Sequence, residues 1–137
     1  MKSLPVLLRV AKRDLDLLRR ALAEQMKKAQ QLELRIQMHE QTILQEQQAA
    51  LRDYESQRAY GGYAVVAIAT REAMKGERAA IEQESERLRT LIAEAHVEMR
   101  KFERLLELQE EREHKAREKR EDAELDEMAT LRAGRQR

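Results

Sequence analysis

The stretch Tyr60-Gly61-Gly62-Tyr63 decides the fold predicted for this chain, because it holds the only two adjacent glycines among 137 residues. Glycine reaches backbone angles that other residues avoid, so a glycine pair is a natural place for a helix to stop and for the chain to reverse. Sequence rich in helix-forming residues lies on both sides of the pair. We therefore predict two long helices, about residues 4–59 and 64–132, joined by a turn at residues 60–63.

The composition is typical of long helices and coiled coils. Charged residues make up 39% of the chain and aromatic residues only 3%, which leaves little material for a globular core. Ala, Glu, Arg, Leu, Lys and Gln predominate, as they do in coiled coils. The single proline, Pro5, lies in the first turn of the first predicted helix, where proline is tolerated, and no proline interrupts either helix after it.

Charge, cysteine content and hydropathy exclude several classes of protein. The 27 basic and 26 acidic residues nearly cancel, which gives no reason to expect nucleic-acid binding, since that usually requires a basic face. The absence of cysteine excludes disulfides and thiolate metal sites. No segment approaches the roughly 20 apolar residues that span a bilayer, and the apolar run at residues 4–8 is shorter than the core of a signal peptide. We expect a soluble, cytoplasmic protein.

Apolar residues recur at steps of three and four along both predicted helices, which is the pattern of a coiled-coil seam. The first seam comprises Leu8, Ala11, Leu15, Leu18, Leu22, Gln25, Ala29, Leu32, Ile36, His39 and Ile43. The second seam comprises Ile81, Ser85, Leu88, Ile92, Ala95, Met99, Phe102, Leu106 and Gln109.

The two seams can be aligned as an antiparallel pair. In such a pair the residue numbers of facing residues add up to a constant, which we call the register sum. Pairing Ile43 with Ile81 sets the register sum at 124, and the same value places Ile36 opposite Leu88. The midpoint is Gly62. The predicted fold is therefore all-α, with two long helices in a single antiparallel coiled-coil hairpin over residues 1–137, and we expect a monomer.

The sequence contains no nucleotide-binding loop, no nucleophile motif and no cluster of metal ligands. A helical hairpin has little room for a catalytic pocket, so we expect no enzymatic activity, no cofactor and no metal. Glu111 and His114 have the spacing of a di-iron ligand pair, but a single copy within a charged run favours a solvated helix face. His39 has two interpretations: a polar seam residue that fixes the register opposite Ser85, or a ligand or pH switch.

Three apolar features exceed what a bare hairpin requires. A line near the turn is either a frayed end of the first seam or a binding surface: Gln47, Leu51 and Tyr54. The run at residues 65–69 is either a buried contact or a patch that binds a partner. A cluster beyond the charged residues 110–124 is either a frayed tail or a docking element: Leu125, Met128 and Leu131.

Three short motifs resemble the FliJ family of the bacterial flagellar type III export apparatus. They are Leu-Leu-Arg-Val at residues 7–10, Ala-Ile-Glu-Gln at residues 80–83 and Leu-Asp-Glu-Met-Ala at residues 125–129. The resemblance extends over nearly the whole chain. It implies a two-stranded antiparallel coiled coil, like the stalk of a rotary ATPase, that acts without catalysis in the cytoplasm, peripheral to the inner membrane at the export gate.

The resemblance also implies partners and the residues that contact them. The partners are the export ATPase FliI, the gate protein FlhA and export chaperones. Gln47, Leu51 and Tyr54 match an exposed family line assigned to gate binding, and Ala80 matches its counterpart on the second helix. The cluster of Leu125, Met128 and Leu131 is then the expected contact with the ATPase. The chain departs from the family pattern at Arg58, Ala73 and Glu77, where large apolar or aromatic residues are expected.

Two other functions remain open from the sequence. One is the stalk of a virulence-type secretion system. The other is a self-assembling structural coiled coil, in which two straight chains pair and the glycines only form a kink.

Overall fold

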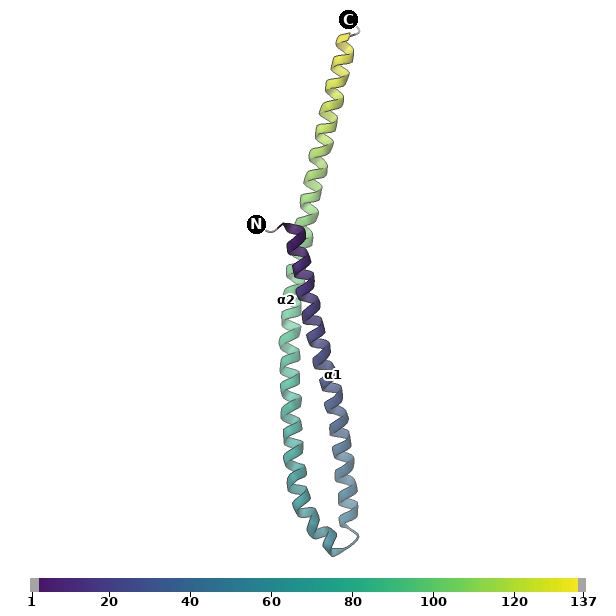
Figure 1. The fold of residues 1–137 in the computed structure, drawn as a ribbon, viewed down its shortest axis with the longest axis vertical. Coiled ribbons are helices and arrows are strands. Elements are labelled where there is room, and N and C mark those ends of the chain that lie inside the picture. Colours follow the sequence, from purple (N-terminus) through teal and green to yellow (C-terminus); the bar gives the residue numbers. More distant parts are fainter. Residues whose placement is uncertain (1–2, 136–137) are drawn as a thin grey trace. The chain divides into compact units, whose positions relative to one another are not determined.

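The computed structural model describes residues 3–135, which form two helices and no strand (Figure 1). Helix α1 comprises Leu4–Ala50 and helix α2 comprises Tyr54–Arg135. Only residues 51–53 separate them. The prediction of an all-α fold with two long helices is confirmed.

The chain divides into two compact units. Residues 15–94 form the first, which we call the hairpin unit; in it the end of α1 and the beginning of α2 pack antiparallel (Figure 1). Residues 1–14 and 95–137 form the second, which we call the terminal unit. Within the terminal unit, Leu7, Val10 and Ala11 of α1 line one shallow hollow together with Ala95 and Phe102 of α2.

The predicted seams form the core of the molecule. All members of the first seam are buried or half-buried except Ala29, and all members of the second are buried or half-buried except Gln109. Burial also extends each seam toward the turn, since Ala50, Ala67 and Met74 are buried as well. The apolar periodicity therefore identified the buried faces correctly but missed their continuation.

The turn lies at residues 51–53, so the predicted turn at residues 60–63 is wrong. The end of α1 tightens through a hydrogen bond from the Arg52 amide to the Ala49 carbonyl, 3.1 Å. Asp53 then starts α2 as its N-cap: its Oδ1 accepts a hydrogen bond from the Ser56 amide at 2.7 Å. This hydrogen bond holds the pKa of the Asp53 carboxyl below its ordinary value of 3.8.

Gly61 and Gly62 lie inside α2 rather than in a turn. Within residues 3–135 no glycine has a positive φ, and a Cβ added at either position would meet nothing within 4 Å. The observed helix therefore does not require glycine here. A capping aspartate, not the glycine pair, sets the point at which the chain reverses.

The predicted register is also wrong. Three ion pairs join the helices across the hairpin: Glu33–Arg78 at 2.5 Å, Arg35–Glu77 at 3.1 Å and Glu40–Arg71 at 3.1 Å. Their residue numbers add up to 111 or 112, not 124. Along the seams, Ile36 shares a hollow with Met74 and Ala29 shares one with Ile81, which gives a register sum of 110. The register thus differs from the prediction by two heptads.

Candidate partner-binding surfaces

The predicted gate-binding line is interrupted by the turn. Gln47 lies in the last turn of α1, Leu51 in the connection and Tyr54 at the start of α2. Leu51 is 79% exposed and Tyr54 is 74% exposed, so both are available to a partner. These side chains surround the end of the hairpin, however, and do not share one face of a single helix as predicted.

Ala80 does not join these three residues. It is exposed on α2, 26 residues beyond Tyr54, which is about 39 Å along a helix. In the observed register Ala80 lies opposite residue 30, whereas a register sum of 124 would have placed it opposite residue 44, close to Gln47. The structure therefore separates Ala80 from the other predicted gate-binding residues.

Further apolar residues are exposed near the turn. Of the run at residues 65–69, Ala67 is buried in the hairpin, whereas Val65, Val66 and Ile68 are exposed. Residues 59–70 contain no charged side chain. We define the turn-end surface as Leu44, Leu51, Tyr54, Val65, Val66 and Ile68, all of which are exposed. The sequence indicated Leu51, Tyr54 and the run at residues 65–69 as separate features and did not indicate Leu44.

Tyrosine is concentrated at the same end of the hairpin unit. All three tyrosines of the chain lie within residues 54–63. The rings of Tyr60 and Tyr63 are 6.1 Å apart and tilted by 38°, and both residues are half-buried. Tyrosine supplies a large contact area together with a polar hydroxyl, and it is enriched at protein interfaces.

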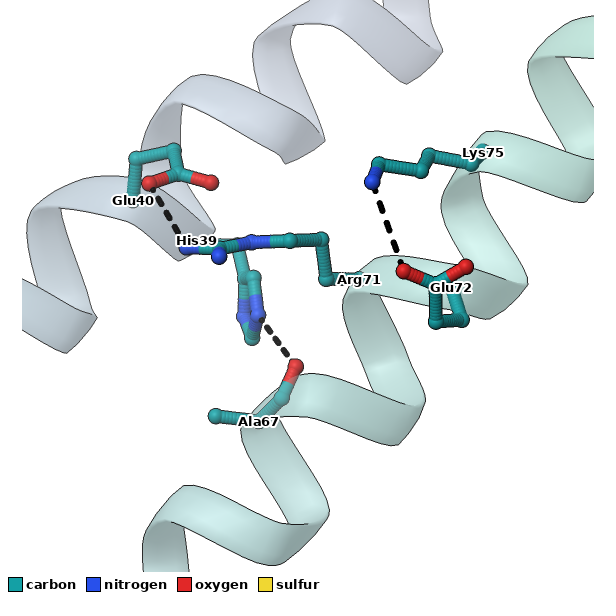
Figure 2. A network of polar contacts seen from close by, with 6 residues as sticks. All are labelled: His39, Glu40, Ala67, Arg71, Glu72 and Lys75. Carbon is teal, nitrogen blue, oxygen red and sulfur yellow. Dashed lines mark hydrogen bonds and ion pairs between the residues drawn. The ribbon is translucent and has the colours of Figure 1, made fainter.

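A polar network crosses the hairpin beside the turn-end surface (Figure 2). His39 of α1 points toward α2, where its Nε2 lies 3.1 Å from the Ala67 carbonyl oxygen, so the ring nitrogen donates a hydrogen bond. Arg71 of α2 reaches back to Glu40 at 3.1 Å, and its Nε is buried without a hydrogen bond. His39 thus makes a polar contact in the seam as predicted, but with Ala67 rather than Ser85.

No metal site accompanies these polar groups. Residues 3–135 contain no group of three His, Cys, Asp or Glu side chains that could hold a metal ion. The Nε2 of His114 lies 3.1 Å from a carboxylate oxygen of Glu118, one helical turn later. This contact on an exposed helix agrees with the interpretation of the charged run as a solvated face.

The C-terminal part of α2 forms a second candidate surface. Every residue from Gln109 to Arg135 is exposed. Leu125, Met128 and Leu131 are 64%, 55% and 59% exposed, and the first two lie in a shallow hollow with Ala129, Arg132 and Ala133. The structure therefore places Leu125 and Met128 together, with Leu131 beside the hollow but outside it.

Comparisons with models of known protein families, with curated proteins and with solved structures found no match to this chain. Neither described helix contains a segment apolar enough, over a sufficient length, to cross a membrane.

Proposed function

We propose that this chain is a non-enzymatic stalk of a type III protein export apparatus, similar to the FliJ family. In this role it binds the export ATPase FliI, contacts the gate protein FlhA and interacts with export chaperones. It acts in the cytoplasm and reaches the inner membrane only through these partners. The short motifs at residues 7–10, 80–83 and 125–129 support the family, and the two-helix hairpin is the fold that such a stalk requires.

The observation on which the proposal rests is the exposed helix from Gln109 to Arg135. Leu125 and Met128 share a face there that nothing in the described chain covers. An amphipathic helix with an uncovered apolar stripe is suited to docking in a groove of a partner protein. We assign this stripe, together with Leu131, to the ATPase, and the turn-end surface to the gate protein.

The ATPase contact is tested with the triple variant Leu125→Ser/Met128→Ser/Leu131→Ser. A matched control is Glu111→Ser/His114→Ser/Arg117→Ser, which has the same spacing on the charged part of the same exposed helix. The triple variant should lose binding to purified FliI while the control retains it, with helicity followed by circular dichroism. Retained binding in the triple variant would remove the C-terminal stripe as the ATPase contact.

The gate contact is tested in the same way. Leu51→Ser/Tyr54→Ser should weaken binding to purified FlhA and leave FliI binding unchanged. Leu34→Ser/Met38→Ser is the control, because these two residues are also exposed and apolar but lie away from the turn. If neither FliI nor FlhA binds the unmodified chain, the export function is wrong.

A stalk of a virulence-type secretion system would use the same surfaces, so its ATPase should be assayed beside FliI. Tighter binding to the virulence-type ATPase would favour that system. Pairing of two straight chains is disfavoured by the three ion pairs that join α1 to α2 within one chain.

A further inference from the structure

The apolar seams of the hairpin unit fit more than one register. Because both seams repeat every seven residues, a slip of one helix past the other by whole heptads again brings apolar residues together. Ile36 faces Met74 in the observed register; after one heptad it would face Ile81, and after two heptads Leu88. Apolar packing alone therefore distinguishes these registers poorly.

Polar contacts select the observed register. After a slip of two heptads, Glu33, Arg35 and Glu40 would face Ile92, Leu91 and Ser85, and all three cross-helix ion pairs would be lost. The side chains of these pairs are 40% to 58% exposed. Exposed ion pairs of this kind each change an equilibrium constant by only about one- to fivefold. The preference for the observed register therefore rests largely on weak contacts.

The glycine pair lies where a slipped hairpin would turn. In the observed helix Gly61 and Gly62 touch nothing that excludes a side chain, and each disfavours an exposed helix by about fivefold relative to alanine. A register sum of 124 has its midpoint at Gly62. There the same glycines would form the reversal, for which they are well suited.

We propose that the hairpin unit has a second register, displaced by two heptads, in which the turn moves from residues 51–53 to residues 60–63. The first helix then extends to about residue 59 and takes up Leu51, Asp53 and Tyr54. In the slipped register the first seam continues beyond Ile43 and Ala50 to Asp53, which would face Arg71. The slip changes which residues flank the turn: Leu51 and Tyr54 lie at the end of the hairpin only in the observed register, and they move into the first helix in the slipped one. The register therefore controls whether a partner meets these two side chains at the turn. This inference does not depend on the export function.

Cysteine pairs can report the register, because the chain has no cysteine of its own. His39→Cys is combined with Arg71→Cys for the observed register, with Arg78→Cys for a slip of one heptad and with Ser85→Cys for a slip of two. Successive partners are about 10 Å apart along α2, whereas a disulfide needs Cα atoms within about 7 Å. His39→Cys with Gln83→Cys is the background control, since residue 83 lies off the seam.

Oxidation should close the 39–71 pair fastest. It should also close the 39–85 pair more slowly, yet well above the 39–83 background. Products within one chain keep the 16.1 kDa mass of the monomer and are thereby separated from crosslinked dimers. A second series, Ile36→Cys with Met74→Cys or Leu88→Cys, leaves the His39 hydrogen bond intact and should give the same order.

Glycine and cap substitutions then shift the equilibrium in opposite directions. Gly61→Ala/Gly62→Ala should lower the 39–85 closure rate about thirtyfold, because alanine favours helix at both positions. Asp53→Ala should raise that rate, because it removes the cap used only in the observed register. Gly76→Ala is the matched control: residue 76 is helical in both registers, so the ratio of the two closure rates should not change.

The second register is overturned if the 39–85 pair closes no faster than the 39–83 control in the Asp53→Ala background. It is also overturned if Gly61→Ala/Gly62→Ala and Gly76→Ala have the same effect on 39–85 closure.

Discussion

Two parts of helix α2 differ in what stabilises them, although both are rich in charge. Between residues 67 and 88, three apolar side chains spaced by heptads are buried against α1: Ala67, Met74 and Leu88. Between residues 109 and 135, no side chain is buried. There the helix depends on intrinsic propensity and on contacts one turn apart, such as His114–Glu118, which contribute only a few tenths of a kcal/mol each.

The comparison teaches that one helix can serve two purposes along its length. The apolar face of the buried part already packs against α1 within the hairpin. The exposed part has both an uncovered apolar stripe and little tertiary stabilisation, which are properties of a helix that is free to pack against a partner. Substitutions in the two parts should accordingly differ in their effect on stability.

The largest effect on the free energy of unfolding is expected in α1, where Leu32 packs beside Ile81 in the buried part of α2. Leu32 is 2% exposed, whereas Leu34, two residues later on the same helix, is 60% exposed. Leu32→Ala should lower the free energy of unfolding by about 3 kcal/mol through lost burial and the resulting cavity. Leu34→Ala should change it by less than about 0.5 kcal/mol. Both are measured by denaturant titration followed by circular dichroism; equal effects would show that Leu32 is not in the core.

A smaller effect on the free energy of unfolding is expected for substitutions of Asp53, the N-cap of α2. Because the Ser56 hydrogen bond lowers the pKa of Asp53 below 3.8, the ionised carboxylate contributes stability above the unfolded pKa, near 3.8. That contribution is lost as the pH falls through the lower folded value. The stability difference between the unmodified chain and Asp53→Ala should therefore be constant from pH 7 to pH 5 and shrink below pH 4.

Asp53→Asn is the control for titration, because asparagine also caps helices but does not ionise. It should stay more stable than Asp53→Ala at every pH. If Asp53→Ala and the unmodified chain respond to pH identically, residue 53 does not cap α2 through its carboxylate.

The smallest effect on the free energy of unfolding is expected when the ion pairs across the hairpin are removed. A double-mutant cycle of Glu33→Ala and Arg78→Ala should give a coupling of about 0.5 kcal/mol, because both side chains are about half exposed. Denaturant titration of the four proteins measures it, and the coupling should fall when salt is added. A coupling of zero at low salt would mean that Glu33 and Arg78 do not face each other.

The sequence predicted the buried faces well because burial imposes a period that apolar residues reveal directly. Leu15, Leu32, Ile43 and Leu88 were all assigned to seams and all are buried. The position of the turn was harder to predict from the sequence, because the glycine pair and the Asp53 cap both indicate a reversal of the chain. The glycine pair indicates a reversal at residues 60–63, whereas the Asp53 cap produces one ten residues earlier, and the cap has only a single-residue signature.

The register could not be deduced from apolar residues, since seams that repeat every heptad match at several offsets. The flanking charges hold the missing information: Glu33 faces Arg78 and Glu40 faces Arg71 only in the observed register. For the candidate surfaces, periodicity placed Leu125 and Met128 on one exposed stripe. Ala80 was assigned through the family resemblance, and its position relative to Gln47 depends on the register.

The position of the turn is tested most directly by one distance within a single chain. Nitroxide labels at Arg35→Cys and Glu77→Cys, measured by pulsed electron spin resonance on diluted protein, report residues that form an ion pair at 3.1 Å. A turn at residues 51–53 predicts a main distance of about 10–20 Å, which is the helix separation plus the label arms. A turn at the glycines would displace one helix along the other by 14 residues, which is about 21 Å, and a main distance of about 23–29 Å would contradict the account.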